Sequence, residues 1–123
     1  MGLFNMFKKK NSKPVPTLKN GTVKSFDYFA FKIHGVATIP GAQEVLAKKG
    51  CDLYEQPNFV DVKLENDCLN VYINGFRIGS GDKQAKNKFE EHCKKEWNIH
   101  SCSIYGGDND NSYGCKVRIK YFY

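Results

Sequence analysis

Apolar and polar residues alternate along several stretches of the chain, a pattern typical of β-strands with one buried face. Residues 25–35 place Phe29, Phe31 and Ile33 on one face and Tyr28, Ala30, Lys32 and His34 on the other. The same alternation predicts strands within residues 59–79, 99–105 and 114–122. Their inward rows would be Val60, Val62 and Leu64; Leu69, Val71 and Ile73; Phe76 and Ile78; and Val117, Ile119 and Tyr121.

Two short turns divide the middle of the chain. Asn66-Asp67 and Asn74-Gly75 lie between the alternating runs. Asn-Gly is the strongest two-residue hairpin signal in a sequence, because both residues tolerate a positive φ. Residues 59–79 therefore predict a three-stranded meander.

A short helix is predicted after the first strand. Pro40 stands before residues 41–49 and Gly50 follows them directly, the usual placement of these two residues at the ends of a helix. Lysines in the last turn suit the negative end of the helix dipole. We expect Val45 and Leu46 to face the core.

A second helix is predicted over residues 83–97, with Asp82 as its N-cap. Apolar residues recur there every four positions and would form its buried stripe: Ala85, Phe89, Cys93 and Trp97. The resulting order is β-α-β-β-β-α-β-β. Short antiparallel strands with two helices predict an α+β fold built on a small curled sheet or barrel.

The composition is that of a folded domain, since the 123 residues are 41% hydrophobic and 26% charged. No apolar run reaches the roughly 20 residues of a transmembrane helix, and no signal peptide is recognisable. Five cysteines occur without a Cys-x-x-Cys pair, which is typical of reduced thiols. These features exclude a large enzyme, a channel and a secreted disulfide scaffold, and we expect a cytoplasmic protein.

The net charge of +6 comes from the first 24 residues. Six lysines and no acidic residue occur there, whereas residues 25–123 carry the other 13 basic residues and all 13 acidic ones. We interpret residues 1–24 as a basic flexible leader and residues 25–123 as one globular domain. Residues 1–10 combine apolar side chains with lysines, but one weak amphipathic turn does not predict membrane contact.

No catalytic or metal-binding set can be recognised. The cysteines and histidines lack the spacing of zinc ligands, and no Ser-His-Asp or Cys-His arrangement is evident. Residues 108–114 are rich in Asp and Asn, but Tyr113 and Ile119 stand where a calcium loop needs Gly and Glu. We therefore expect a non-enzymatic protein with no metal or other cofactor.

The last strand carries a basic and aromatic row. Lys116, Arg118, Lys120 and Phe122 share the face that points away from the apolar row. Three cations beside aromatic rings suit a single-stranded nucleic-acid backbone with base stacking. The alternative is an ordinary solvated strand face, or an edge protected by charge against aggregation.

Four segments spread over residues 29–121 carry a family resemblance. They are Phe31-Lys32-Ile33-His34-Gly35-Val36; Ala42-Gln43-Glu44-Val45-Leu46, closed by Gly50; Asn70-Val71-Tyr72-Ile73-Asn74-Gly75-Phe76-Arg77-Ile78-Gly79; and Ile104-Tyr105-Gly106-Gly107 with Tyr113-Gly114-Cys115-Lys116-Val117. In this order they resemble the HIRAN family, namely its opening strand, its helix, its strand-turn-Ile-Gly segment and its closing hairpin.

The resemblance implies a small SH3/OB-like barrel with helices packed on it, which binds single-stranded DNA and can grip a free 3′ end. Lys83, four residues after Gly79, matches a lysine that contacts DNA in some members. The chain departs from the family in two segments. They are Glu65-Asn66-Asp67-Cys68, which replaces an Asn-Pro-Tyr-Asp loop of the DNA pocket, and Ser80-Gly81-Asp82, which replaces Tyr-Val-Pro.

We therefore predict a non-catalytic binding module for single-stranded or 3′-end-bearing DNA. Its candidate contacts are Lys83, Lys116, Arg118 and Lys120 for phosphates, and Tyr105 and Phe122 for base stacking. The alternative, favoured by the missing loop and the neutral domain, is a protein-interaction domain. In that hypothesis the lysine-rich leader tethers the domain to a membrane surface or an acidic partner.

Overall fold

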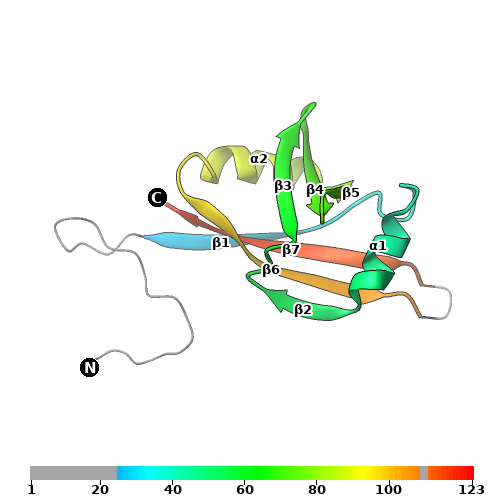
Figure 1. Ribbon diagram of the computed structural model, residues 1–123. Coiled ribbons are helices and arrows are strands. Elements are labelled where there is room, and N and C mark those ends of the chain that lie inside the picture. The colour runs from blue at the N-terminus through cyan, green and yellow to red at the C-terminus, as the bar shows by residue number, and fades with distance from the viewer. Residues whose placement is uncertain (1–24, 109–110) are drawn as a thin grey trace, which may run out of the picture.

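The computed structural model describes residues 25–108 and 111–123, which form two antiparallel sheets and two helices (Figure 1). In chain order the elements are β1 (Phe26–Lys32), α1 (Ala42–Lys49), β2 (Asp52–Glu55), β3 (Val60–Glu65), β4 (Cys68–Ile73), β5 (Phe76–Ser80), α2 (Lys83–His92), β6 (Trp97–Gly106) and β7 (Tyr113–Phe122). The predicted α+β class is confirmed. Neither helix among the described residues is long and apolar enough to cross a membrane. The leader, and with it the question of membrane contact, lies outside the described residues.

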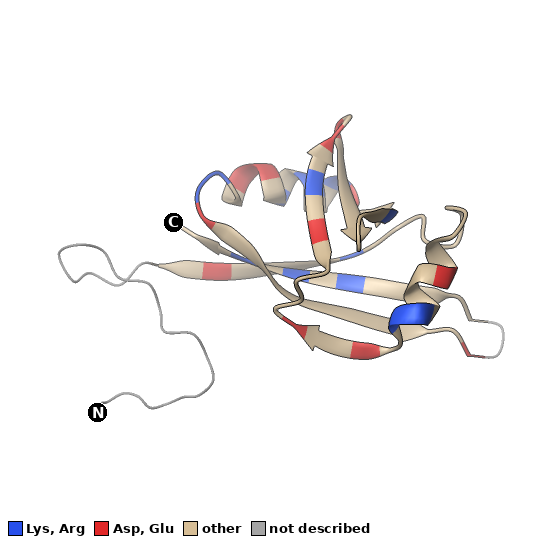
Figure 2. Ribbon diagram, viewed as in Figure 1, with Lys and Arg blue, Asp and Glu red and all other residues tan. Residues whose placement is uncertain are grey.

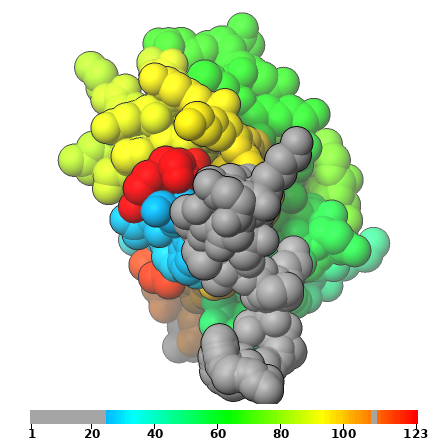
Figure 3. All heavy atoms as spheres, turned by 90° about the vertical axis from the view of Figure 1, so that its left-hand side faces the viewer, coloured from blue at the N-terminus to red at the C-terminus, as the bar shows by residue number. Residues whose placement is uncertain are grey.

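Four strands form the larger sheet, in the order β1-β7-β6-β2. β1 pairs with β7 from Phe26 opposite Phe122 to Lys32 opposite Lys116. Figure 3 looks at the end of the molecule where the start of β1 lies beside the end of β7. Because side chains alternate along a strand, one face of this sheet carries the buried row and the other a polar row. The buried row is Phe29, Phe31, Cys102, Ile104, Cys115, Val117, Ile119 and Tyr121.

The smaller sheet is the predicted meander, in the order β3-β4-β5. Its two turns have the positive φ angles that their sequences favour: 49° and 65° at Asn66 and Asp67, and 50° and 81° at Asn74 and Gly75. Such turns match the right-handed twist of the strands that they join. The inward row of β4 is fully buried, as expected: Leu69, Val71 and Ile73.

The two sheets meet where the chain leaves β1. His34 pairs with Ser80 of β5 through backbone hydrogen bonds of 2.7 and 3.0 Å. Gly79 permits this approach, because a Cβ there would lie 2.5 Å from the carbonyl oxygen of His34. The apolar faces of the sheets share one core, which α1 covers against β5 and β7 and α2 against β4 and β1.

The helices form around a few buried side chains. In α1, Ala42 and Leu46 are fully buried, and Val45 packs partly buried against the core. In α2, the predicted N-cap is present, since a carboxylate oxygen of Asp82 accepts a 2.8 Å hydrogen bond from the backbone N–H of Ala85. The buried side chains of α1, together with Ala85 of α2, which is 3% exposed, hold both helices against the core.

The predicted end of the second helix is wrong. α2 stops at His92, and Trp97 is the first residue of β6 rather than the last of the helix. Its ring still packs edge-on against Phe89, with centroids 5.1 Å apart. The four-residue apolar spacing therefore corresponds to a real contact between Phe89 and Trp97. This contact forms between the helix and the start of the next strand, and not within one longer helix.

The alternation of the sequence does not predict β2, so the observed order contains one more strand than expected. β2 is four residues long and lies at the edge of its sheet, with Leu53 exposed and Tyr54 turned toward the core. Two predicted core residues of the meander are also wrong, since Leu64 is 40% exposed and Phe76 is 38% exposed. Leu64 lies close to the β3–β4 turn, which extends away from the larger sheet (Figure 1).

Candidate nucleic-acid interface

β7 presents two different surfaces, because its alternate residues point to opposite sides of the sheet. The core side receives Cys115, Val117, Ile119 and Tyr121. The other side, which we call the open face, receives Lys116, Arg118 and Lys120, of which the first two are exposed and the third is half-buried. Successive cations on one face of a strand lie about 7 Å apart. Figure 2 shows basic positions recurring along the β7 ribbon.

β1 adds a fourth cation and an aromatic ring to the open face. The relevant pairs across β1 and β7 are Lys32–Lys116, Ala30–Arg118 and Tyr28–Lys120. Among the described residues, no carboxylate lies within ion-pair distance of Lys32, Lys116 or Arg118. The open face therefore concentrates positive charge, although residues 25–123 are neutral in sum.

Aromatic rings surround the cations at one end of the open face. The Nζ atom of Lys120 lies 4.2 Å from the ring centroid of Phe26 and 6.0 Å from that of Tyr28. The guanidinium carbon of Arg118 lies 5.7 Å from the Tyr28 centroid. Such cation–aromatic contacts hold long basic side chains over the sheet while their charged ends stay near water.

His100 is a titratable group at this end. Its ring packs edge-on against Tyr28, with centroids 4.8 Å apart. Burial is the largest cause that lowers the pKa of His100, and the nearby charges of Lys120 and Arg118 lower it further, while Glu55 acts in the opposite direction. The imidazole is therefore held neutral near pH 7.

Tyr105 lies at the other end of the open face. Its side chain is 39% exposed and covers Gly114, where any side chain would collide with the ring. Gly114 precedes Lys116 by two residues on the same face of β7. The ring of Tyr105 therefore lies next to the row of cations, at its Lys116 end. Burial raises the pKa of the Tyr105 phenol, which keeps its proton as a hydrogen-bond donor.

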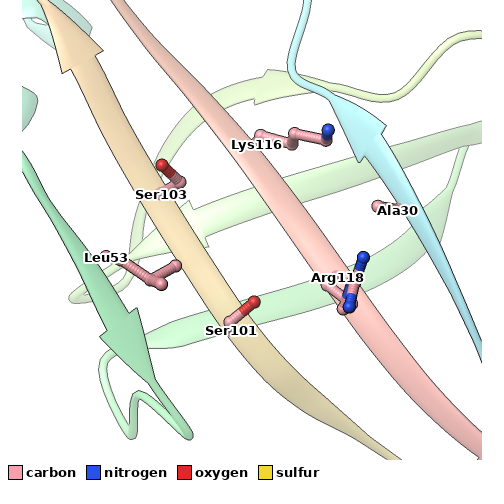
Figure 4. Close-up of a pocket in the computed structure, with 6 residues that line it drawn as sticks. All are labelled: Ala30, Leu53, Ser101, Ser103, Lys116 and Arg118. Atoms are coloured by element: carbon pink, nitrogen blue, oxygen red, sulfur yellow. The ribbon is translucent and has the colours of Figure 1, made fainter.

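A hollow of about 350 Å³ opens in the middle of the face. It is lined by Ala30, Leu53, Ser101, Ser103, Lys116 and Arg118. Figure 4 shows Ser101 and Ser103 on β6, with Leu53 of β2 on one side of them and the two cations of β7 on the other. The hollow exists because the side chains over the centre of the sheet are small.

The structure gathers Lys116, Arg118, Lys120 and Tyr105 on one surface but separates two other predicted contacts from it. Phe122 is 4% exposed and packs edge-on against Phe26, with centroids 6.1 Å apart, so its expected role as a stacking platform is wrong. Lys83 begins α2, which covers the core side of the sheet. Lys83 therefore lies on the other side of the larger sheet from the open face.

Sequence reasoning missed further residues of this surface: Tyr28, Lys32, Leu53, Ser101 and Ser103. Their membership depends on which strands pair and in what register, which the sequence does not state. A partial signal existed, because the alternation in residues 25–35 already placed Tyr28 and Lys32 on the outward side. β2 and its leucine gave no comparable signal.

The outer face of the smaller sheet differs, since its polar groups bind one another. Arg77 donates from Nε to Oδ1 of Asn70 at 3.0 Å, and Asn70 donates from Nδ2 to a carboxylate oxygen of Glu65 at 3.1 Å. The Tyr72 hydroxyl donates to the same oxygen. The hydrogen bonds from Tyr72 and Asn70 lower the pKa of Glu65. This network stabilises the meander itself.

The cysteines are free thiols in different surroundings. Cys102 and Cys115 lie in the core with their Sγ atoms 3.3 Å apart, whereas Cys51 and Cys68 are exposed. Cys93 is partly buried, and this burial raises its pKa to about 11. In the part of the chain that the structure describes, no group of three or more His, Cys, Asp or Glu side chains could hold a metal ion.

No family model matches the chain, and neither the curated proteins nor the solved structures contain a match. The resemblance to the HIRAN family therefore stays a prediction from the sequence. The functional argument rests on the geometry and charge of the open face.

Proposed function

We propose that the open face of the larger sheet binds single-stranded nucleic acid and that the protein is a non-catalytic binding module. The observation that carries this proposal is the row of Lys116, Arg118 and Lys120, with Lys32 beside it and no carboxylate in ion-pair contact with Lys32, Lys116 or Arg118 among the described residues. The resemblance to the HIRAN family favours DNA, including DNA with a free 3′ end, as the ligand.

The arrangement suits a polyanion with exposed bases. Each phosphate that a cation neutralises releases counterions, so affinity falls with salt by a slope of about −0.7 per phosphate of a single strand. Three or four phosphate contacts would give a slope of about −2 to −3. Tyr105 and Tyr28 at the two ends of the row can contact bases, which in a single strand have free ring faces.

The test is fluorescence anisotropy of the full chain with a labelled oligothymidylate at several salt concentrations. Lys116→Ala plus Arg118→Ala should weaken binding at least ten-fold and make the salt slope less steep by about 1.4, because two phosphate contacts are lost. Both side chains are exposed, so the variant should keep its circular dichroism spectrum and melting temperature.

A matched control removes the same charge from another surface. Lys83→Ala plus Lys88→Ala lies on the exposed side of α2 and should bind like the wild-type chain. If this control loses affinity while the β7 variant does not, the contact that the HIRAN resemblance suggests at Lys83 is favoured and the open face is not the interface.

The leader supports a second candidate function, because its lysines can attract an anionic partner without the domain. Lys8→Gln, Lys9→Gln and Lys10→Gln in the full chain separate the two contributions. If these changes abolish binding and the β7 variant has no effect, the domain is better explained as a protein-interaction module with a basic tether.

A further inference from the structure

The hollow on the open face has walls of different chemistry. Lys116 and Arg118 of β7 stand on one side, and Leu53 of β2 stands on the other (Figure 4). Between them, β6 contributes two hydroxyl groups, Ser101 and Ser103, as the floor. We call this feature the β6 trough.

The register of the strands sets this arrangement. Ser103 lies between Leu53 and Lys116, because β6 pairs with β2 on one side and with β7 on the other. Ser101 lies in the same way between Glu55 and Arg118. The trough therefore passes from a cationic wall, across hydroxyl groups, to a wall with one apolar and one acidic side chain.

Leu53 is the unusual member, since it is 57% exposed in a strand whose first and last residues are acidic. A single exposed leucine is common on protein surfaces. Here, however, it faces a row of cations across a strip of small polar residues. An apolar wall opposite a cationic wall fits a ligand with an anionic side and a flat apolar side.

We propose that the β6 trough seats the unpaired bases of a single strand whose phosphates lie along the cations of β7. This inference rests on the proposed function and adds a binding subsite for the bases, because it requires bases and not merely a polyanion. A base would place one ring face against Leu53, and its polar edge could bond the hydroxyls of Ser101 and Ser103. The hollow of about 350 Å³ has room for such a ring.

The experiment compares two labelled strands of equal length and phosphate number, an oligothymidylate and its abasic counterpart, binding to the full chain. The leader lysines meet the same phosphates in both strands, so the ratio of the two affinities isolates the bases. The wild-type chain should bind the base-bearing strand about ten-fold more tightly, the scale of one favourable base contact.

Two variants change the trough without changing its charge. Ser101→Ile plus Ser103→Ile fills it with side chains that β-strands favour, and Leu53→Ala removes its apolar wall from an exposed position. Either variant should lower the affinity ratio while the abasic strand binds as before, and any ratio that remains would come from base contacts at Tyr28 and Tyr105. Ala47→Leu, which adds apolar bulk on the exposed side of α1, should leave the ratio unchanged.

Four results would overturn the inference. An affinity ratio near one in the wild-type chain, or a ratio that the trough variants leave unchanged, contradicts seated bases while electrostatic binding to the open face still stands. If neither strand binds, or if Lys116→Ala plus Arg118→Ala leaves both affinities unchanged, the proposed function is wrong. The inference about the trough is then wrong as well, because it depends on that function.

Discussion

Along β7, alternate side chains point into the core and onto the surface. Lys116 stands between Cys115 and Val117, which are both fully buried, so the backbone that holds this cation is anchored on its other side. Cations that share a face repel one another, and a bound row of phosphates would relieve that repulsion. The open face therefore has an electrostatic reason to accept an anionic chain.

We predict that binding is linked to the protonation of His100. Tyr28, Lys120, Arg118 and Glu55 are the titratable or charged groups that face it, and burial with the two cations lowers its pKa. Phosphates bound at Lys120 and Arg118 would offset these charges and raise that pKa. Affinity should therefore increase as the pH falls below about 6.5, the ordinary value for histidine, because binding then takes up a proton.

Anisotropy titrations between about pH 5.5 and 8 measure this linkage. His100→Gln should flatten the profile while keeping most of the affinity at pH 8. If affinity depends on pH in the same way in the wild-type chain and in His100→Gln, binding is not linked to the protonation of His100.

Among the strands and helices, β6 and β7 hold the part of the core that lies directly beneath the open face. Cys102 and Cys115 are fully buried there with their Sγ atoms 3.3 Å apart, so a reagent in solution cannot reach either thiol. The exposed Cys51 and Cys68 lie outside this layer. The five cysteines therefore report separately on the surface and on the core.

A thiol-reactive disulfide reagent should modify Cys51 and Cys68 within minutes at neutral pH. Cys102 and Cys115 should react only under denaturing conditions, and Cys93 should react slowly, because its pKa is raised to about 11. Mass spectrometry of the labelled peptides distinguishes them. Rapid labelling of Cys102 or Cys115 in the native protein would show that the β6–β7 pairing opens readily.

Most elements could be predicted from the sequence because their signals are local. Asn66-Asp67 and Asn74-Gly75 specify tight turns, and Asp82 specifies the start of α2. β2 could not be predicted, because a short edge strand needs little apolar alternation. The end of α2 was misplaced because Trp97 contacts Phe89 equally well from the start of a strand.

The candidate site was predictable along one strand but not across the sheet. The alternation of β7 alone places Lys116, Arg118 and Lys120 together. The β6 trough depends on the pairing of β2, β6 and β7, which brings Leu53 opposite the cations. The burial of Phe122 could not be predicted, because alternation shows to which side of the strand a residue points but not which other side chains cover it.

In the molecule as a whole, a backbone junction between His34 and Ser80 joins the smaller sheet to the larger, in addition to the core that the two sheets share. Gly79 sits at this junction, and a Cβ there would lie 2.5 Å from the His34 carbonyl oxygen and 2.6 Å from a methyl carbon of Ile33. The backbone oxygen cannot move without breaking the pairing of His34 with Ser80. The fit between the sheets therefore requires glycine.

We predict that Gly79→Ala lowers the free energy of unfolding by about 1–3 kcal/mol, the usual cost of forcing an extra methyl group into a packed site. Ser80→Ala is the matched control and should change it by less than about 0.5 kcal/mol, because the backbone hydrogen bonds to His34 remain. Urea denaturation measures both. Equal stability of Gly79→Ala and the wild-type chain would contradict the tight junction.

The most direct test of the central claim is to map the binding surface by NMR, following backbone amide shifts of the labelled full chain as a single-stranded oligonucleotide is added. The account predicts that the largest shifts occur along the open face, around Lys116, Arg118, Ser101 and Ser103, with Leu53 among them. α2 and the meander should change little. Shifts confined to α2, to the meander or to the lysine leader would contradict binding at the open face.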